Sequence, residues 1–135
     1  MRGVYTAHQR VAATYRKGRI FLAGDAAHLN NPKGGMGLNG GLHDAYSLAG
    51  RLAKVCLGEA SETELDGYEP QRRPEAVDAI LKQTDQNISN LKADDAAREK
   101  VFAEYRRKAA DPGLARQFLL QASMIASLRR CGMLD

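Results

Sequence analysis

Apolar positions follow a strand pattern early in this 135-residue chain and a helical pattern over most of the rest. The opening stretch, 4–15, has β-branched and aromatic residues without helical periodicity, which favours a strand or an irregular sheet edge. After a turn signal at Lys17-Gly18, the run 20–23 is short and wholly apolar, which is typical of a strand buried on both faces. From Leu42 onward, apolar residues recur at helical spacing as far as Gly58, which can end a helix. We therefore expect a buried strand followed by a long helix.

A glycine-rich segment lies between this strand and this helix. Five of the eight residues in 34–41 are glycine, which predicts a loop with unusual backbone angles or a close approach to a ligand. The loop leads into a helix N-terminus, where free N–H groups and the helix dipole favour negative charge. Asp25 stands at the carboxyl end of the strand, the edge at which open α/β sheets bind ligands. The strand end, the loop and the helix start together indicate a nucleotide-cofactor site.

The second half of the chain predicts three amphipathic helices. Ser61 and Glu64 form a capping box before the first of them, and Pro70 and Pro74 are expected to bend or interrupt its first turns. A break at 111–113 separates the other two helices. The apolar stripes comprise Val77, Ile80, Leu81, Ile88 and Leu91 with Thr84 in the first helix, Val101, Phe102, Tyr105 and Ala109 in the second, and Leu114, Phe118, Ala122, Ile125 and Leu128 in the third.

These patterns predict a mixed α/β fragment that is mostly helical. The only candidate domain boundary lies near 57–61, so we expect one region over 1–58, with short strands, the glycine loop and its helix, and a helical region over 59–135. The net charge of +4 comes from basic residues spread along the chain without interleaved aromatic side chains. They are expected to form solvated helix faces, and no nucleic-acid partner is expected.

Cysteine usage and hydropathy indicate a cellular location. Cys56 and Cys131 lie far apart, with no spacing typical of zinc binding or of a redox pair, so they are expected to stay reduced and no metal site is expected. No apolar run approaches the ~20 residues of a membrane helix. The N-terminus also lacks the apolar stretch of a secretion signal. We expect a soluble, cytoplasmic protein with no integral membrane segment.

The segment from Gly35 to Gly40 reads GxGxxG, but its surroundings argue against the dinucleotide-binding fingerprint. That fingerprint directly follows a strand and leads through its helix to a second strand that ends in an acid. Here 30–33 precedes the glycines, and no strand delivers Glu59 after the helix. We therefore interpret the glycines as a different kind of cofactor loop.

Two motifs identify a specific family. The pentad Gly24-Asp25-Ala26-Ala27-His28, followed by Pro32, the glycine loop, Leu38-Asn39 and Asp44-Ala45, is similar to the second FAD motif of the group A FAD-dependent aromatic monooxygenases, the para-hydroxybenzoate and phenol hydroxylase-like family. The later segment 68–74 resembles their Tyr-Glu-x-x-Arg-Arg-Pro motif. The resemblance implies that 1–58 is the C-terminal portion of an FAD-binding domain.

The resemblance also implies roles for individual residues. Asp25 would bind the ribityl and pyrophosphate part of FAD, the backbone at Leu38 and Asn39 would meet the pyrimidine edge of the flavin, and Pro32 would lie beside its reactive carbon. A helix N-terminus aimed at the flavin favours the reduced anion by about 0.3–2 kcal/mol. No catalytic acid or base is expected among these residues. The expected cofactor-binding residues are Gly24, Asp25, Pro32, Gly35, Gly37, Leu38 and Asn39.

Several of these positions have simpler interpretations. His28 is expected to hydrogen-bond the backbone and hold the loop rather than to act as a pH-active group. In the first turn of the helix, His43 need not ionise, and Asp44 would complement the helix dipole. Gly37 is expected to leave room for the flavin and to adopt a backbone angle closed to β-branched residues.

The family implies an enzyme in which NAD(P)H reduces FAD and one atom of O2 enters a phenol-like or related ring. The dinucleotide fold and the substrate-enclosing sheet of that family are absent from this sequence, so we expect a fragment that is inactive by itself. One alternative is a non-catalytic helical domain for assembly or dimerisation. Another is a related flavin enzyme, such as a hydroxylase of quinone biosynthesis, an epoxidase or a halogenase. The exposed strand and helical stripes predict a homodimer.

Overall fold

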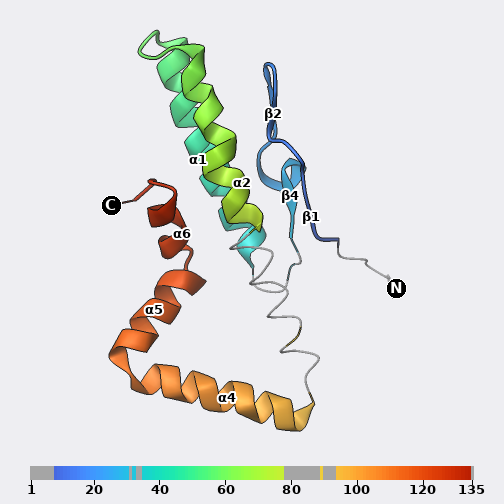
Figure 1. Cartoon of the computed structure of the whole chain (residues 1–135), viewed down its shortest axis with the longest axis vertical. Helices are drawn as coiled ribbons and strands as arrows, with labels where there is room; N and C mark the ends of the chain where they lie inside the picture. The colour runs from blue at the N-terminus through green and yellow to red at the C-terminus, as the bar shows by residue number, and fades with distance from the viewer. Residues whose placement is uncertain (1–7, 31, 33–34, 78–88, 90–93, 135) are drawn as a thin grey trace, which may run out of the picture. The chain divides into compact units, whose positions relative to one another are not determined.

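The structure is a computed structural model that describes residues 8–30, 32, 35–77, 89 and 94–134 (Figure 1). The chain forms two compact units, Met1–Thr84 and Asp85–Asp135. The boundary predicted at 58/59 falls inside the first unit. It concerned the domains of a longer protein, and for those it stays a prediction.

Short antiparallel strands begin the first unit. Strand β1 (Arg10–Val11) pairs with β4 (His28–Leu29), and β2 (Arg16–Lys17) pairs with β3 (Ile20–Phe21). A 3₁₀ turn, η1 (Gly24–Ala26), connects β3 to β4. The registers place Arg10 opposite Leu29 and Arg16 opposite Phe21.

The prediction that 20–23 is a strand buried on both faces is wrong. Regular pairing is confined to β3, and the side chain of Ile20 is 68% exposed. The cause is the turn at Gly18, whose φ of 60° folds β3 back on β2 as a hairpin. Among the described residues, β2 is therefore the strand that β3 pairs with.

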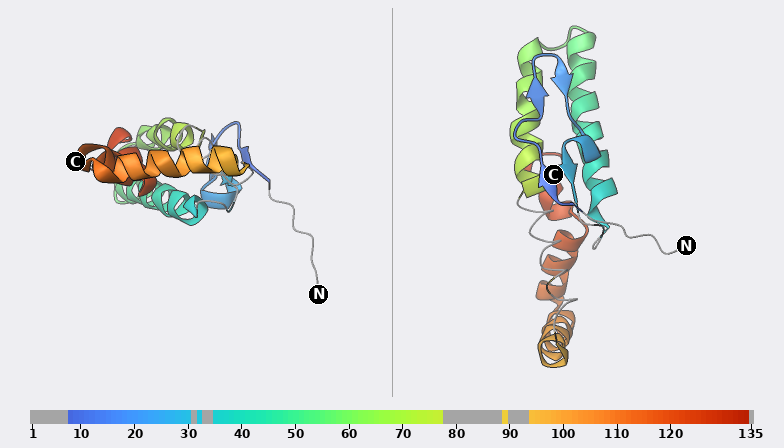
Figure 2. Two further views of the ribbon diagram at one scale, coloured as in Figure 1. Left: turned by 90° about the horizontal axis from the view of Figure 1, so that it is seen from below. Right: turned by 90° about the vertical axis from the view of Figure 1, so that its right-hand side faces the viewer.

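Helices pack side by side behind these strands. Helix α1 (Met36–Cys56) is followed by a 3₁₀ segment, η2 (Glu62–Gly67), and by helix α2 (Tyr68–Glu75). Figure 2 shows α1 and α2 next to each other, with the strands over one side of the pair. The expected stop at Gly58 is present, because this residue has φ 74° and its N–H donates to the Val55 carbonyl.

Helix α1 begins earlier than the glycine pattern predicted. Gly37, Gly40 and Gly41 lie within its first turns instead of in a loop. The close packing of η1 explains the glycine at position 41, since a Cβ there would lie 3.2 Å from the Cα of Gly24. This glycine provides space for a neighbouring backbone rather than an unusual backbone angle.

The predicted capping box at Ser61 does not form. The Ser61 hydroxyl pairs with that of Thr63, and the Ser61 carbonyl accepts a hydrogen bond from the Glu64 N–H, which closes the first 3₁₀ turn of η2. Pro74 lies inside α2, and a wider π-helical turn follows at 76–77. Apart from Val77, the stripe predicted beyond this point lies outside the described residues.

The core of the first unit is small and aromatic. Tyr15 and Tyr68 are fully buried, with ring centroids 6.1 Å apart, and Phe21 meets Tyr68 edge-on at 6.2 Å. Polar side chains are buried beside this cluster, and Tyr15 stacks on the ring of His28. The same region of the core therefore holds apolar and ionisable groups.

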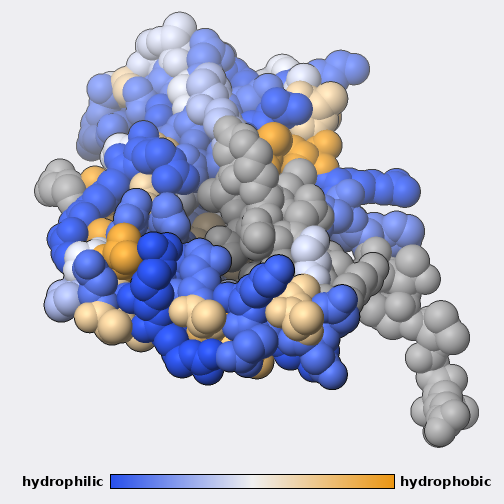
Figure 3. Space-filling view, turned by 60° about the horizontal axis from the view of Figure 1, so that its bottom comes forward, coloured by the Kyte–Doolittle hydropathy of each residue, from blue (hydrophilic) through white to orange (hydrophobic). Residues whose placement is uncertain are grey.

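The second unit consists of consecutive helices, α4 (Asp95–Ala110), α5 (Pro112–Ala122) and α6 (Ile125–Arg130). Asp94 caps α4 by accepting a hydrogen bond from the Ala97 N–H at 2.8 Å, as expected for an N-cap aspartate. Figure 3 shows a face that is mostly hydrophilic, with apolar residues in separate small spots. No helix in the described part of the chain is long and apolar enough to cross a membrane.

The break predicted at 111–113 is present. The prediction of a single helix after it is wrong, because two helices, α5 and α6, follow. Asp111 caps α5, accepting from the N–H groups of Gly113 at 2.8 Å and Leu114 at 3.0 Å. Met124 has φ 62°, a left-handed conformation that ends α5 and starts α6. The Ser123 hydroxyl also donates to the Leu119 carbonyl at 2.6 Å, which satisfies one acceptor at the end of α5.

Candidate functional site

The turn η1 presents Asp25 directly after the β2–β3 hairpin. Gly24 opens this turn with φ 58°, a conformation that favours glycine. The residue after it, Asp25, is exposed. The structure thus places an open carboxylate close behind the end of β3, as the sequence predicted.

The N-terminus of α1 forms the other half of the predicted site. Gly35 is the N-cap residue, with φ 64°, and it has no side chain to cap the first-turn N–H groups. Its own N–H donates to the Pro32 carbonyl at 3.2 Å. Leu38 and Asn39 are exposed in the first turn. The prediction of an unusual backbone angle at Gly37 is wrong, because Gly37 is helical and the left-handed residue is Gly35.

The contact between Gly24 and Gly41 packs η1 directly on α1. An exposed carboxylate and an uncapped helix N-terminus are therefore carried by two elements in contact. Such a pair suits a ligand that combines hydroxyl groups with an electron-rich or anionic edge. FAD combines these groups in its ribityl chain, pyrophosphate and flavin ring. The residues present fit that cofactor.

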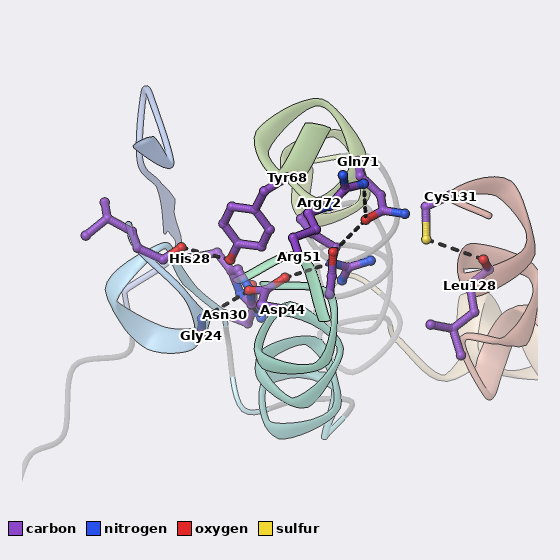
Figure 4. Close-up of polar contacts among 12 residues, drawn as sticks. Gly24, His28, Asn30, Asp44, Arg51, Tyr68, Gln71, Arg72, Leu128 and Cys131 are labelled. Atoms are coloured by element: carbon purple, nitrogen blue, oxygen red, sulfur yellow. Dashed lines mark hydrogen bonds and ion pairs between the residues drawn. The ribbon is translucent and has the colours of Figure 1, made fainter. Parts of the chain in front are cut away.

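A buried ionic network lies under this site (Figure 4). The side chain of Asp44 is fully buried, and those of His28 and Arg72 are each 1% exposed. Asp44 Oδ1 accepts from Arg72 Nε at 2.8 Å, while Oδ2 lies 2.7 Å from His28 Nε2 and 3.0 Å from the Gly24 N–H. Burial raises the pKa of Asp44, but the hydrogen bonds from His28, Arg72 and Gly24 outweigh burial and lower it. Asp44 is therefore an ionised group in the core.

Two sequence interpretations change at this network. His28 was expected to bond the backbone, but its ring nitrogens meet the side chains of Asp44 and, at 3.2 Å, Asn30. Asp44 was expected to complement the dipole in the first turn, but α1 begins at Met36 and Asp44 lies two turns further on, facing inward. His43 also lies beyond the first turn of α1, and burial and then the charge of Arg72 lower its pKa, which favours the neutral ring that the sequence interpretation expected.

Comparison with known proteins places this arrangement in a family. Residues 1–83 match the FAD binding domain family. The chain belongs to that family. It is 40% identical over 126 residues to the para-nitrophenol 4-monooxygenase of Pseudomonas sp. (strain WBC-3), covering 93% of the chain and 31% of the relative. It is 50% identical over 68 residues to the pentachlorophenol 4-monooxygenase of Sphingobium chlorophenolicum, covering 50% of the chain and 13% of the relative.

The fold of the chain matches solved structures as well. The crystal structure of the p-nitrophenol 4-monooxygenase PnpA from Pseudomonas putida DLL-E4 superposes with a TM-score of 0.79 and 39% identity, over 87% of this chain and 31% of that one. The chain thus spans less than a third of the length of each of these relatives. The matches confirm the resemblance, the mixed and mostly helical fold class, and FAD as the cofactor of the family.

The second family motif, at 68–74, has a structural role that the sequence did not reveal. Four of its polar side chains hold neighbouring segments of the first unit from the α2 side. We call these residues, Tyr68, Glu69, Arg72 and Arg73, the α2 clamp. Three of them bind backbone atoms, so they fix the path of the chain. Tyr68 donates to the Leu22 carbonyl at 2.8 Å, Glu69 accepts from the N–H groups of Tyr15 and Arg16 at 2.8 and 3.2 Å, Arg72 donates to Asp44, and Arg73 donates to the Ala12 carbonyl at 3.0 Å.

Proposed function

We propose that this chain is part of an FAD-dependent monooxygenase that uses NAD(P)H and O2 to hydroxylate a phenol-like or related aromatic ring. Family membership and similarity to enzymes named as nitrophenol and pentachlorophenol monooxygenases support this proposal. The observation that carries it is the direct contact between η1, which bears Asp25, and the helix with the uncapped N-terminus. Bound FAD supplies the redox chemistry, and this chain binds and orients it.

In this proposal each predicted cofactor-binding residue has the role that the family motif implies. The Asp25 carboxylate accepts hydrogen bonds from hydroxyl groups of the cofactor, and Gly24 gives the turn its left-handed start. The first-turn N–H groups near Leu38 and Asn39 face the electron-rich edge of the flavin, with Gly35 and Gly37 leaving the approach open. Pro32 borders the ring. These assignments follow the family motif and the exposure of Asp25, Pro32, Gly35, Leu38 and Asn39.

Substitution of Asp25 in the longer, flavin-binding protein tests the site. We expect Asp25→Ala to weaken FAD binding about tenfold or more, because a hydrogen-bonding carboxylate is lost, while the fold stays intact because the residue is exposed. Asp66→Ala is the matched control, since Asp66 is also an exposed aspartate and pairs with Arg16. Flavin absorbance per protein after gel filtration gives the result. A full complement of flavin in Asp25→Ala would contradict the assignment.

We further propose that the 135 residues alone bind FAD weakly, are catalytically inactive and form a homodimer, and that the protein is cytoplasmic. Exposed apolar side chains at Leu38, Leu42 and Tyr46 support self-association, because their four-residue spacing places them on one face of α1. This face also favours the alternative of an assembly domain without a flavin.

A titration of FAD into the purified chain, with light scattering on the same sample, separates these possibilities. We expect a dimer with weak flavin binding, and Leu42→Lys is expected to shift it toward the monomer. A monomer that binds FAD stoichiometrically would show that the chain builds a complete site. If the alternative of an assembly domain is correct, the longer protein will contain no flavin after purification.

A further inference from the structure

The stability of the first unit alone does not explain why Asp44, His28 and Arg72 form a buried ionic network. Asp44, His28 and Arg72 are all almost fully removed from solvent. Burying charges is costly, and apolar side chains of similar volume usually stabilise a core at least as well as an ion pair does. A buried carboxylate with this many partners therefore calls for an explanation in terms of what it holds in place.

The geometry shows which segment it holds. Oδ2 of Asp44 contacts both the N–H of Gly24 and Nε2 of His28. These residues are the first and the last of the pentad, so one oxygen atom binds both ends of the turn that carries Asp25. The other oxygen, Oδ1, binds Arg72 of α2. The carboxylate itself belongs to α1, the helix whose N-terminus is the second half of the flavin site.

We infer that Asp44 is a positioning residue for the flavin, which fixes the η1 turn on α1 and so sets where Asp25 meets the cofactor. Arg72 orients the Asp44 carboxylate and balances its charge from the α2 clamp. The inference rests on the proposed flavin site. It assigns the segment at 68–73 a part in cofactor binding without any contact with the cofactor.

The test compares three variants of the full chain and of the longer flavin-binding protein. Asp44→Asn keeps the shape of the side chain, but only one of its two terminal atoms still accepts hydrogen bonds, so it cannot accept from both Arg72 and the Gly24 N–H. Ser47→Ala is the matched control, because Ser47 lies one turn further along α1, is buried, and bonds Gln71 of α2 at 2.6 Å. This control removes a contact between α1 and α2 that does not involve η1. Asp25→Ala removes the proposed ligand itself.

Two readouts are needed, and one of them requires no flavin. Amide hydrogen exchange, followed by NMR on the 135-residue chain, reports the hydrogen bond of the Gly24 N–H. We expect Asp44→Asn to reduce its protection, and FAD affinity in the longer protein, each by about tenfold, as for one lost hydrogen bond to a charged group. Ser47→Ala should change neither readout. Asp25→Ala should lower the affinity while the Gly24 N–H stays protected.

The outcomes separate this inference from the proposed function. If Asp44→Asn exposes the Gly24 N–H but FAD affinity is unchanged while Asp25→Ala lowers it, the positioning role is overturned and the flavin site stands. If Asp25→Ala also leaves the affinity unchanged, the proposed flavin site fails. If Asp44→Asn does not fold, His28→Ala replaces it, since that variant keeps the pair between Asp44 and Arg72 and releases one end of the turn. Unchanged FAD affinity in His28→Ala would then overturn the inference.

Discussion

Among the described residues, the first unit holds polar contacts between residues far apart in the sequence, whereas caps and pairs between near neighbours recur in the second. Tyr68 bonds Leu22 across 46 positions, and Arg73 bonds Ala12 across 61. In the second unit, Asp94 accepts from the N–H of Ala97, three residues on, and Lys108 pairs with Glu104 within one turn. The first unit therefore depends on a few specific, buried contacts, and the second on helix formation and caps. A single substitution should accordingly cost more in the first unit.

The largest difference is expected for the loss of an arginine from an ion pair. Arg72→Ala leaves Asp44 buried and uncompensated, and should lower the free energy of unfolding of the first unit by about 3–5 kcal/mol. The matched change Arg106→Ala removes an exposed pair with Glu99 in the second unit and should cost less than about 1 kcal/mol. Hydrogen exchange measured separately in each unit gives both values. Equal costs would remove the contrast between the units.

The next largest difference is expected in how the stability of each unit depends on pH and salt. The pKa of Asp44 is lowered as described above, and a hydrogen bond from Lys108 lowers the pKa of exposed Glu104. A folded-state pKa below the unfolded value means that stability is present above about pH 4 and is lost as the pH falls through the folded-state pKa. Salt screens the exposed charge of Glu104 much more strongly than the buried charge of Asp44.

We therefore expect high salt to abolish the part of the acid loss that comes from Glu104 and to leave the part that comes from Asp44. Urea unfolding between pH 6 and pH 2 (about two units to either side of an ordinary carboxyl pKa), at low and high salt, measures this. Glu104→Gln and Asp44→Asn identify each contribution. A loss in the first unit that disappears with salt would argue that Asp44 is accessible to solvent.

The smallest changes in stability are expected for two glycines of α1. They compare a position that contacts η1 with one that does not. A Cβ at Gly41 would meet the backbone of η1 at 3.2 Å, whereas one at Gly50 would have nothing within 4 Å. Gly50→Ala should therefore stabilise the unit by about 0.5–1 kcal/mol through helix propensity. Gly41→Ala should lose this gain and weaken FAD binding in the longer protein. Thermal melts and flavin titration compare them, and equal stabilisation would mean that η1 is free to move away.

Local features of the fold could be predicted from the sequence because their causes are local. The helical spacing after Leu42 and the helix break at 111–113 act over a few residues, and the structure contains both. The strand at 20–23 was interpreted as buried because its residues are apolar, but burial depends on which segments flank it. The hairpin turn at Gly18 gives it one neighbour among the described residues.

The network at the site could not be predicted in the same way. Asp44 and Arg72 are 28 positions apart, and each is a common residue on a helix surface. The available signal was indirect, since the pentad and the segment at 68–74 occur together in the family although they are distant in sequence. The two motifs are connected through Asp44 only after α2 has packed beside α1. The individual flavin contacts stay a prediction.

The α2 clamp recognises peptide groups, and this affects how the region tolerates change. Tyr68, Glu69 and Arg73 bind the backbone of 12–22. Every residue except proline offers the same N–H and carbonyl groups to these partners. The hairpin can therefore exchange most of its exposed side chains without losing its anchor. For protein engineering, its tip is a site where new sequence can be grafted while these backbone contacts stay in place.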